Sequence, residues 1–106
     1  MAKSVGSGGV FVSDSKTVTT AGTAEALAAT NFLLWTGVTI VAKDNNTGRI
    51  YVGGTISSTV ASTTNRGLGP GDTLTITPSR GHSINLSETY IDASVSGEGV
   101  DYYAVA

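Results

Sequence analysis

Residues 38–52 read Val-Thr-Ile-Val-Ala-Lys-Asp-Asn-Asn-Thr-Gly-Arg-Ile-Tyr-Val, and this stretch decides the fold class. Apolar side chains recur at every second position of residues 38–42, which is the period of a β-strand with one buried face. Residues 44–48 follow with side chains that cap their own backbone or tolerate a positive φ. We therefore expect residues 50–52 to return antiparallel to residues 38–42 as a hairpin.

Further short strands and turns are expected along most of the chain. The strand pattern recurs at residues 10–12, 16–20, 73–77, 90–93 and 100–105. Pro70 presets φ for a turn in which Gly71 takes the left-handed position. Residues 57–67 and 79–87 are polar and unpatterned and should form loops, whereas residues 23–29 fit either one helical turn or a strand. About seven to eight short strands separated by turn signals predict an all-β fold, a small antiparallel β-sandwich or β-barrel.

The chain has 106 residues, which corresponds to one domain. Residues 1–9 are rich in glycine and serine and are expected to form a flexible N-terminal arm, because glycine loses the most backbone entropy when it is ordered. Residues 10–106 would then form a single β-sandwich domain. Its expected core consists of the inward-facing apolar residues Val38, Ile40, Ile50, Val52, Leu74, Ile76, Ile91 and Val100.

Composition excludes several classes of function. Charged residues make up 13% of the chain and the net charge is −2, so nothing supports the neutralisation of phosphates that nucleic-acid binding requires. The chain has no cysteine, which excludes disulfides, thiolate catalysis and cysteine-ligated zinc. The longest apolar stretch, residues 32–35, is far too short to span a bilayer. We expect neither a nucleic acid nor a membrane as partner.

The side chains that could carry chemistry are few and scattered. His82 lies in a glycine-flanked polar loop, and no Gly-x-Ser-x-Gly elbow accompanies it. Asp92, Glu98 and Asp101 could converge on a hard cation such as calcium, although acidic residues beside a turn are routine. We therefore predict no enzymatic activity, no catalytic residues, no metal site and no cofactor.

Large apolar residues offer candidates for protein contacts. Because side chains alternate along a strand, Leu33 and Trp35 fall on the face opposite Phe32 and Leu34. Either a bulge at Gly37 lets all four join the core, or Leu33 and Trp35 stay partly exposed and contact a neighbouring subunit. Tyr102 and Tyr103 face opposite ways for the same reason. The candidate interface residues are Val10, Phe11, Leu33, Trp35, Tyr51, Tyr102 and Tyr103.

Three motifs follow one another along the chain. They are Asn-Thr-Gly-x-Ile-Tyr-Val-Gly at residues 46–53, Leu-Gly-Pro-Gly at residues 68–71, and Ile-Asp-Ala followed by Gly-Glu-Gly-Val within residues 91–100. In this order they resemble the motifs of small virion structural proteins of tailed bacteriophages. The sequence departs from the family at residues 32–35, which are more apolar here.

The resemblance implies a capsid decoration (cement) protein, made in the host cytoplasm and located on the capsid surface of the virion. Such a protein binds the major capsid protein on the assembled head as a homodimer or homotrimer, and stabilises the head by bridging capsomers. The alternative is a head-fibre or tail/adhesin module that binds a host-surface receptor or glycan. Glycan binding would require aromatic residues clustered in one concave patch, and the seven aromatics are dispersed along the chain. A small hydrolase or lyase is a third, disfavoured reading.

Overall fold

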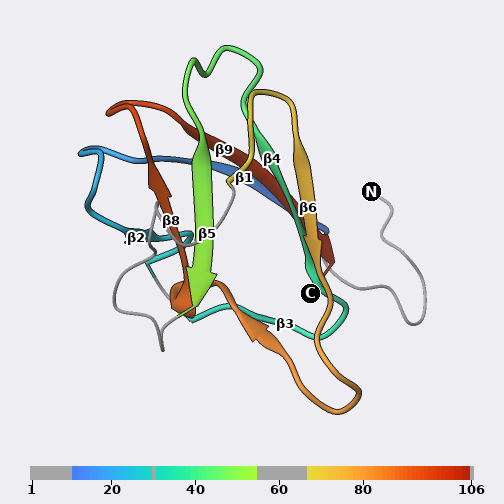
Figure 1. Cartoon of the computed structure of the whole chain (residues 1–106). Coiled ribbons are helices and arrows are strands. Elements are labelled where there is room, and N and C mark those ends of the chain that lie inside the picture. The colour runs from blue at the N-terminus through green and yellow to red at the C-terminus, as the bar shows by residue number, and fades with distance from the viewer. Residues whose placement is uncertain (1–10, 30, 55–66, 106) are drawn as a thin grey trace, which may run out of the picture.

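A computed structural model describes residues 11–29, 31–54 and 67–105 (Figure 1). The predicted arm at residues 1–9, Val10 and most of the predicted loop at residues 57–67 lie outside the described residues. The strands are β1 (Phe11–Thr17), β2 (Glu25–Ala26), β3 (Leu33–Leu34), β4 (Val38–Ala42), β5 (Ile50–Gly54), β6 (Thr73–Ile76), β7 (Ile84–Asn85), β8 (Thr89–Ala93) and β9 (Gly99–Val105). Within these residues the single helical element is the 3₁₀ turn η1 (Leu86–Glu88).

The strands form three antiparallel sheets, so the all-β prediction is confirmed. One sheet has the order β1-β9-β4-β6, the second has the order β2-β8-β5, and the third consists of β3 and β7. The two larger sheets face each other, and the β3–β7 pair crosses the end of the molecule at which β4 begins (Figure 1). Of the two alternatives for residues 23–29, the structure has the strand, because β2 pairs with β8.

The core fills the space between the two larger sheets. Five of the eight predicted core residues are at most 2% exposed: Val38, Ile40, Ile50, Ile91 and Val100. Val52, Leu74 and Ile76 are only partly buried. β6 is an edge strand, and β5 is bonded on its outer side only at the bridge between Ile50 and Leu68. Other buried residues complete the core, among them Val18, Leu27, Leu34, Leu86 and Tyr102.

The predicted hairpin between residues 38–42 and 50–52 is wrong. β4 pairs with β6 and β9, whereas β5 pairs with β8 in the other sheet. The loop between them is held by Asn46, which is 6% exposed. Its side-chain amide donates to the carbonyl of Gly99 at 2.9 Å, and its side-chain oxygen accepts from the Gly99 N–H at 3.3 Å. The loop therefore crosses between sheets instead of closing a turn within one.

The turn predicted at Pro70 and Gly71 is confirmed. Gly71 has a φ of +82°, in the left-handed region that favours glycine. The Asp72 N–H donates to the Gly69 carbonyl at 2.9 Å, which closes the turn. The turn leads directly into β6, whose Leu74 lies opposite Ile40 of β4.

Truncation of a core residue in β4 should cost far more stability than truncation at the edge of the same sheet. Ile40 is fully buried, so Ile40→Ala removes apolar contacts and leaves a cavity, which should lower the free energy of unfolding by about 2–5 kcal/mol. Leu74 is half-buried on β6, and Leu74→Ala should cost roughly 1–2 kcal/mol. Urea unfolding of both variants measures the difference. Equal losses would contradict the placement of Ile40 in the core.

Candidate functional site

The three carboxylates considered for a metal site do not converge. Asp92 is buried and accepts hydrogen bonds from the N–H groups of Gly22 at 2.9 Å and of its neighbour Ala93 at 2.7 Å. Asp101 forms an ion pair with Lys43 at 2.6 Å. Among the described residues, no three His, Cys, Asp or Glu side chains are grouped so that they could hold a metal ion. His82 is exposed in the loop before β7.

Glu98 is bound to the loop between β4 and β5. Its carboxylate accepts from the N–H of Thr47 at 2.6 Å, from the Thr47 hydroxyl at 2.8 Å, and from the N–H of Gly48 at 2.9 Å. These bonds favour the ionised form, the Gly48 N–H most of all, and they lower the pKa of Glu98 below its ordinary value of 4.5. The side chain has a structural role, since it links the start of β9 to the crossing loop.

The lowered pKa of Glu98 gives its contribution to stability a definite pH dependence. A carboxyl with a depressed pKa stabilises the fold above its unfolded pKa and loses that contribution as the pH falls through its folded pKa. Glu98→Gln should therefore be less stable than the unsubstituted chain at neutral pH, and the difference should shrink as the pH falls below 4.5. Urea unfolding across this pH range measures it, with the exposed Glu88→Gln as a matched control. A difference that stays constant with pH would contradict the assignment.

The large apolar residues ahead of β4 alternate between buried and exposed positions. Leu34 is fully buried while Leu33 is 47% and Trp35 59% exposed, so the four residues do not all join the core and these two stay partly exposed. Their contact with a neighbouring subunit stays a prediction. Gly37 has a φ of +114°, and a side chain there would strike the carbonyl of Ile76. The glycine allows the tight passage from β3 into β4 and leaves the alternation of the preceding residues intact.

The two C-terminal tyrosines also alternate. Tyr103 is 41% exposed, but Tyr102 is 4% exposed and belongs to the core, so its candidate role as a contact residue is corrected. It faces inward because it lies opposite Ile40 across β4 and β9. Its hydroxyl lies 3.5 Å from the Leu27 carbonyl, and burial raises the pKa of this tyrosine.

The remaining candidate interface residues also differ in exposure. Tyr51 is half-buried, Phe11 is 66% exposed, and Val10 lies outside the described residues. Val95, in the loop between β8 and β9, is 40% exposed and was not predicted from the sequence, because it stands alone in a polar turn.

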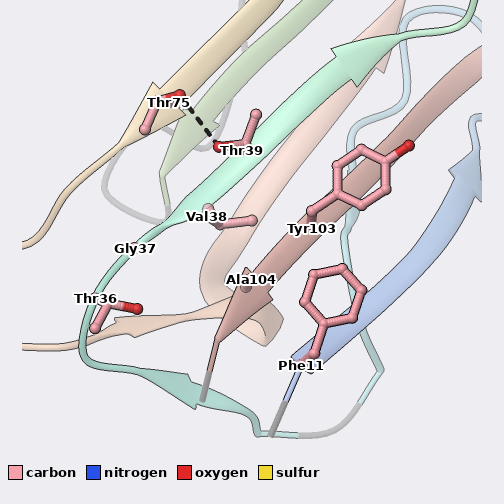
Figure 2. A pocket seen from close by; sticks show the side chains of 8 residues that line it. All are labelled: Phe11, Thr36, Gly37, Val38, Thr39, Thr75, Tyr103 and Ala104. Carbon is pink, nitrogen blue, oxygen red and sulfur yellow. Dashed lines mark hydrogen bonds between the residues drawn. The ribbon is translucent and has the colours of Figure 1, made fainter. Parts of the chain in front are cut away.

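A shallow hollow lies between two of the exposed aromatic side chains and the start of β4. Its volume is about 250 Å³, and it is lined by Phe11, Thr36, Gly37, Val38, Thr39, Thr75, Tyr103 and Ala104 (Figure 2). None of these residues is charged.

Strand register explains why residues so distant in the sequence meet at the hollow. Phe11 lies opposite Val105 and Ser13 opposite Tyr103, so the two rings are diagonal neighbours on one face of the β1–β9 pair. They stack with ring centres 6.5 Å apart and planes 19° from parallel. Tyr103, Thr39 and Thr75 lie side by side across three strands, and the two threonine hydroxyls are 3.2 Å apart in a hydrogen bond.

Leu33 and Trp35 lie on the segment that leads into this hollow, since Thr36 follows Trp35 directly. We call Phe11, Leu33, Trp35 and Tyr103 the contact surface. Sequence reasoning named all four residues but could not place Phe11 beside Tyr103, because the register that joins β1 and β9 is not local.

Comparisons with known proteins give one structural likeness. No protein-family model matches the chain, and no curated protein matches it closely. A chain described as the cyanophage Pam1 capsid asymmetric unit is similar to it, with 22% sequence identity and a TM-score of 0.36. The match covers 99% of this chain and 89% of that chain. Because chains with so low a TM-score need not share a fold, the function is argued from this chain's own residues. In the described residues, no helix is long and apolar enough to cross a membrane.

Proposed function

We propose that this chain is a capsid decoration protein of a tailed bacteriophage, which binds the outside of the assembled head and bridges capsomers. The observation that carries the proposal is the contact surface. Phe11, Leu33, Trp35 and Tyr103 are each 41–66% exposed, and two of them border a hollow whose lining is uncharged. Large apolar side chains left this exposed, two of them stacked beside the hollow, favour a surface that another protein covers.

The polar groups of the chain support a structural role over a catalytic one. Asp92, Glu98 and Asp101 each hold the backbone or a lysine in place, and His82 stands apart from all three in an exposed loop. A nucleophile would need a base within hydrogen-bonding reach, and His82 is the chain's one histidine. The proposed role is structural and calls for neither catalysis nor a cofactor.

The motifs that resemble phage virion proteins act together in the fold, which supports the phage assignment. Asn46 and Gly48 belong to the first motif, and Glu98 and Gly99 belong to the last. Hydrogen bonds join Asn46 to Gly99 and Gly48 to Glu98. The two motifs thus form one structural unit of this fold.

Multiple weak contacts would give the proposed protein its strength of attachment. A homo-oligomer that engages several identical capsid sites turns each later contact into an intramolecular one, which commonly raises avidity by roughly 10²–10⁴. Such a mechanism needs one contact between copies and another to the major capsid protein. The predicted arm at residues 1–9 is a candidate for the second, because a segment that a partner orders can add a strand or a tether.

One structural observation supports the alternative, a head-fibre or tail module that binds a host-surface glycan. Phe11 and Tyr103 present near-parallel rings beside a hollow that also contains threonine hydroxyls, so two aromatics do share a concave patch. The hollow has no carboxylate, amide or guanidinium group to fix the hydroxyls of a sugar. The protein-contact reading remains the better supported of the two.

Removal of the arm should weaken attachment to the head without unfolding the domain. Deletion of residues 1–9 takes away the proposed tether, so binding to undecorated heads should fall by about tenfold or more. The melting temperature of the free protein should change little, because the core identified in the described part of the chain lies wholly outside residues 1–9. Sedimentation of the protein with purified undecorated heads measures binding, and electron microscopy shows where the protein sits.

His82→Ala is the matched control for this experiment, since it changes an exposed loop residue and should leave attachment intact. The decoration proposal fails if the full chain binds no phage head. It also fails if His82→Ala abolishes a catalytic or glycan-binding activity of the purified protein.

A further inference from the structure

The two outer edges of the four-stranded sheet, β1 and β6, differ in how they are protected against a further strand. In β1 the Ser15 N–H donates to the carboxylate of its neighbour Asp14 at 2.8 Å. A strand added to β1 would have to displace this carboxylate, and charged residues on an edge are a common protection against unwanted pairing. β6 consists of Thr73–Ile76, and none of these residues is charged. The edge at β6 therefore lacks the protection that β1 has.

The register of β6 shows which of its backbone groups are turned away from the sheet. The Ala42 N–H donates to the Asp72 carbonyl at 2.9 Å. Hydrogen-bonded and non-hydrogen-bonded pairs alternate along an antiparallel ladder, so Leu74, two positions further on, also bonds to β4. The N–H and C=O groups of Thr73 and Thr75 then point away from β4. Within the part of the chain that the structure describes, these groups have no hydrogen-bond partner.

An apolar hollow adjoins this edge on the inner side of the sheet. It has a volume of about 230 Å³ and is lined by Ile50, Val52, Gly67, Leu68 and Leu74, and we call it the β5–β6 hollow. β5 and β6 lie on the same side of the molecule, one in each of the two larger sheets (Figure 1). An apolar cavity of about 150 Å³ holds a benzene molecule, so the β5–β6 hollow has room for one bulky aliphatic or aromatic side chain.

Burial of the apolar residues around the β5–β6 hollow is incomplete. Val52, Leu74 and Ile76 were expected in the core from their alternation, yet each is only half-buried. Thr73 and Thr75, on the other face of β6, are exposed. A strand added beside β6 would cover the inner side chains and would at the same time supply partners for the outer backbone groups.

We propose that the free edge of β6 accepts an extended segment of the major capsid protein as an additional strand, with a bulky aliphatic side chain of that segment in the β5–β6 hollow. In strand addition, main-chain hydrogen bonds supply affinity and pockets for alternate side chains supply specificity. The segment is uncharged where it passes the hollow, because no lining residue could pair with a buried charge. The source of the strand rests on the proposed function, whereas the edge and the hollow are properties of this chain alone.

The first test is amide hydrogen exchange of the free chain, which needs no capsid. Followed by NMR, the Thr75 N–H should exchange at least about 100-fold faster than the Leu74 N–H, which bonds to β4. An equally slow Thr75 amide would overturn the proposal, because another part of the chain or a second copy would then already occupy the edge. When undecorated heads are added, exchange followed by mass spectrometry should show new protection across residues 73–76.

The second test is the binding of Thr75→Pro to undecorated heads, measured by sedimentation. Proline removes the outward N–H and is tolerated on an edge strand, where the sheet does not use that N–H. Binding should fall by about tenfold or more, because backbone hydrogen bonds to the added strand are lost. Ser15→Pro is the matched control, since the Ser15 N–H is also turned away from the sheet, and it should bind like the unsubstituted chain. Thermal melts of both variants report whether the fold is retained.

The outcomes separate this proposal from the proposed function. If the unsubstituted chain binds heads and a folded Thr75→Pro binds as tightly, strand addition at β6 is overturned while capsid decoration stands. If the unsubstituted chain binds no head, the proposed function fails and the capsid strand with it. If Thr75→Pro does not fold, hydrogen exchange of the unsubstituted chain decides, because bound heads that leave residues 73–76 unprotected would equally overturn the proposal.

Discussion

The fold depends on the joining of two loops that each carry the chain from one sheet to the other. The loop between β4 and β5 and the loop between β8 and β9 meet through the Asn46 amide on Gly99 and the Glu98 carboxylate on Thr47 and Gly48. A buried amide that satisfies both backbone groups of a distant residue is costly to disturb, because its loss leaves unpaired polar groups in the interior. These bonds fix the spacing of the two sheets at one end, and the core of Ile40, Ile50, Ile91 and Val100 fills the space between them.

Local sequence patterns predicted most of the longer strands but not all of their partners. They also missed β7, which lies within the loop predicted at residues 79–87. Alternation located β4, β6 and β8, and proline followed by glycine located the turn before β6, because these signals lie within a few residues. The same signals suggested a hairpin between β4 and β5 that does not exist. Asn46 and Gly48 suit a tight turn and a crossing loop equally well. Their hydrogen bonds to Gly99 and Glu98, about fifty positions further along the chain, stabilise the crossing loop and not the tight turn.

The sequence allowed the individual residues of the contact surface to be predicted, but not which of them lie close together in space. Alternation showed that Leu33 and Trp35 oppose Leu34, and that Tyr102 opposes Tyr103, but alternation does not say which face of a strand is covered. The second sheet decides this, by placing Tyr102 inside and Tyr103 outside. Phe11 and Tyr103 come together through a pairing between the first and last strands, which no local pattern specifies.

The arrangement separates the part of the molecule that secures the fold from the part that is free to bind. β9 begins at Gly99, in the hydrogen-bonded corner, and reaches Tyr103 at the hollow, while β4 runs the other way from Val38 to Ala42. Two central, paired strands therefore connect the corner to the hollow, which is lined by Tyr103 of β9 and by Val38 and Thr39 of β4. Because Phe11, Leu33, Trp35 and Tyr103 contribute little to the core, their apolar character is not explained by folding. The proposed partner, by covering them, would explain it.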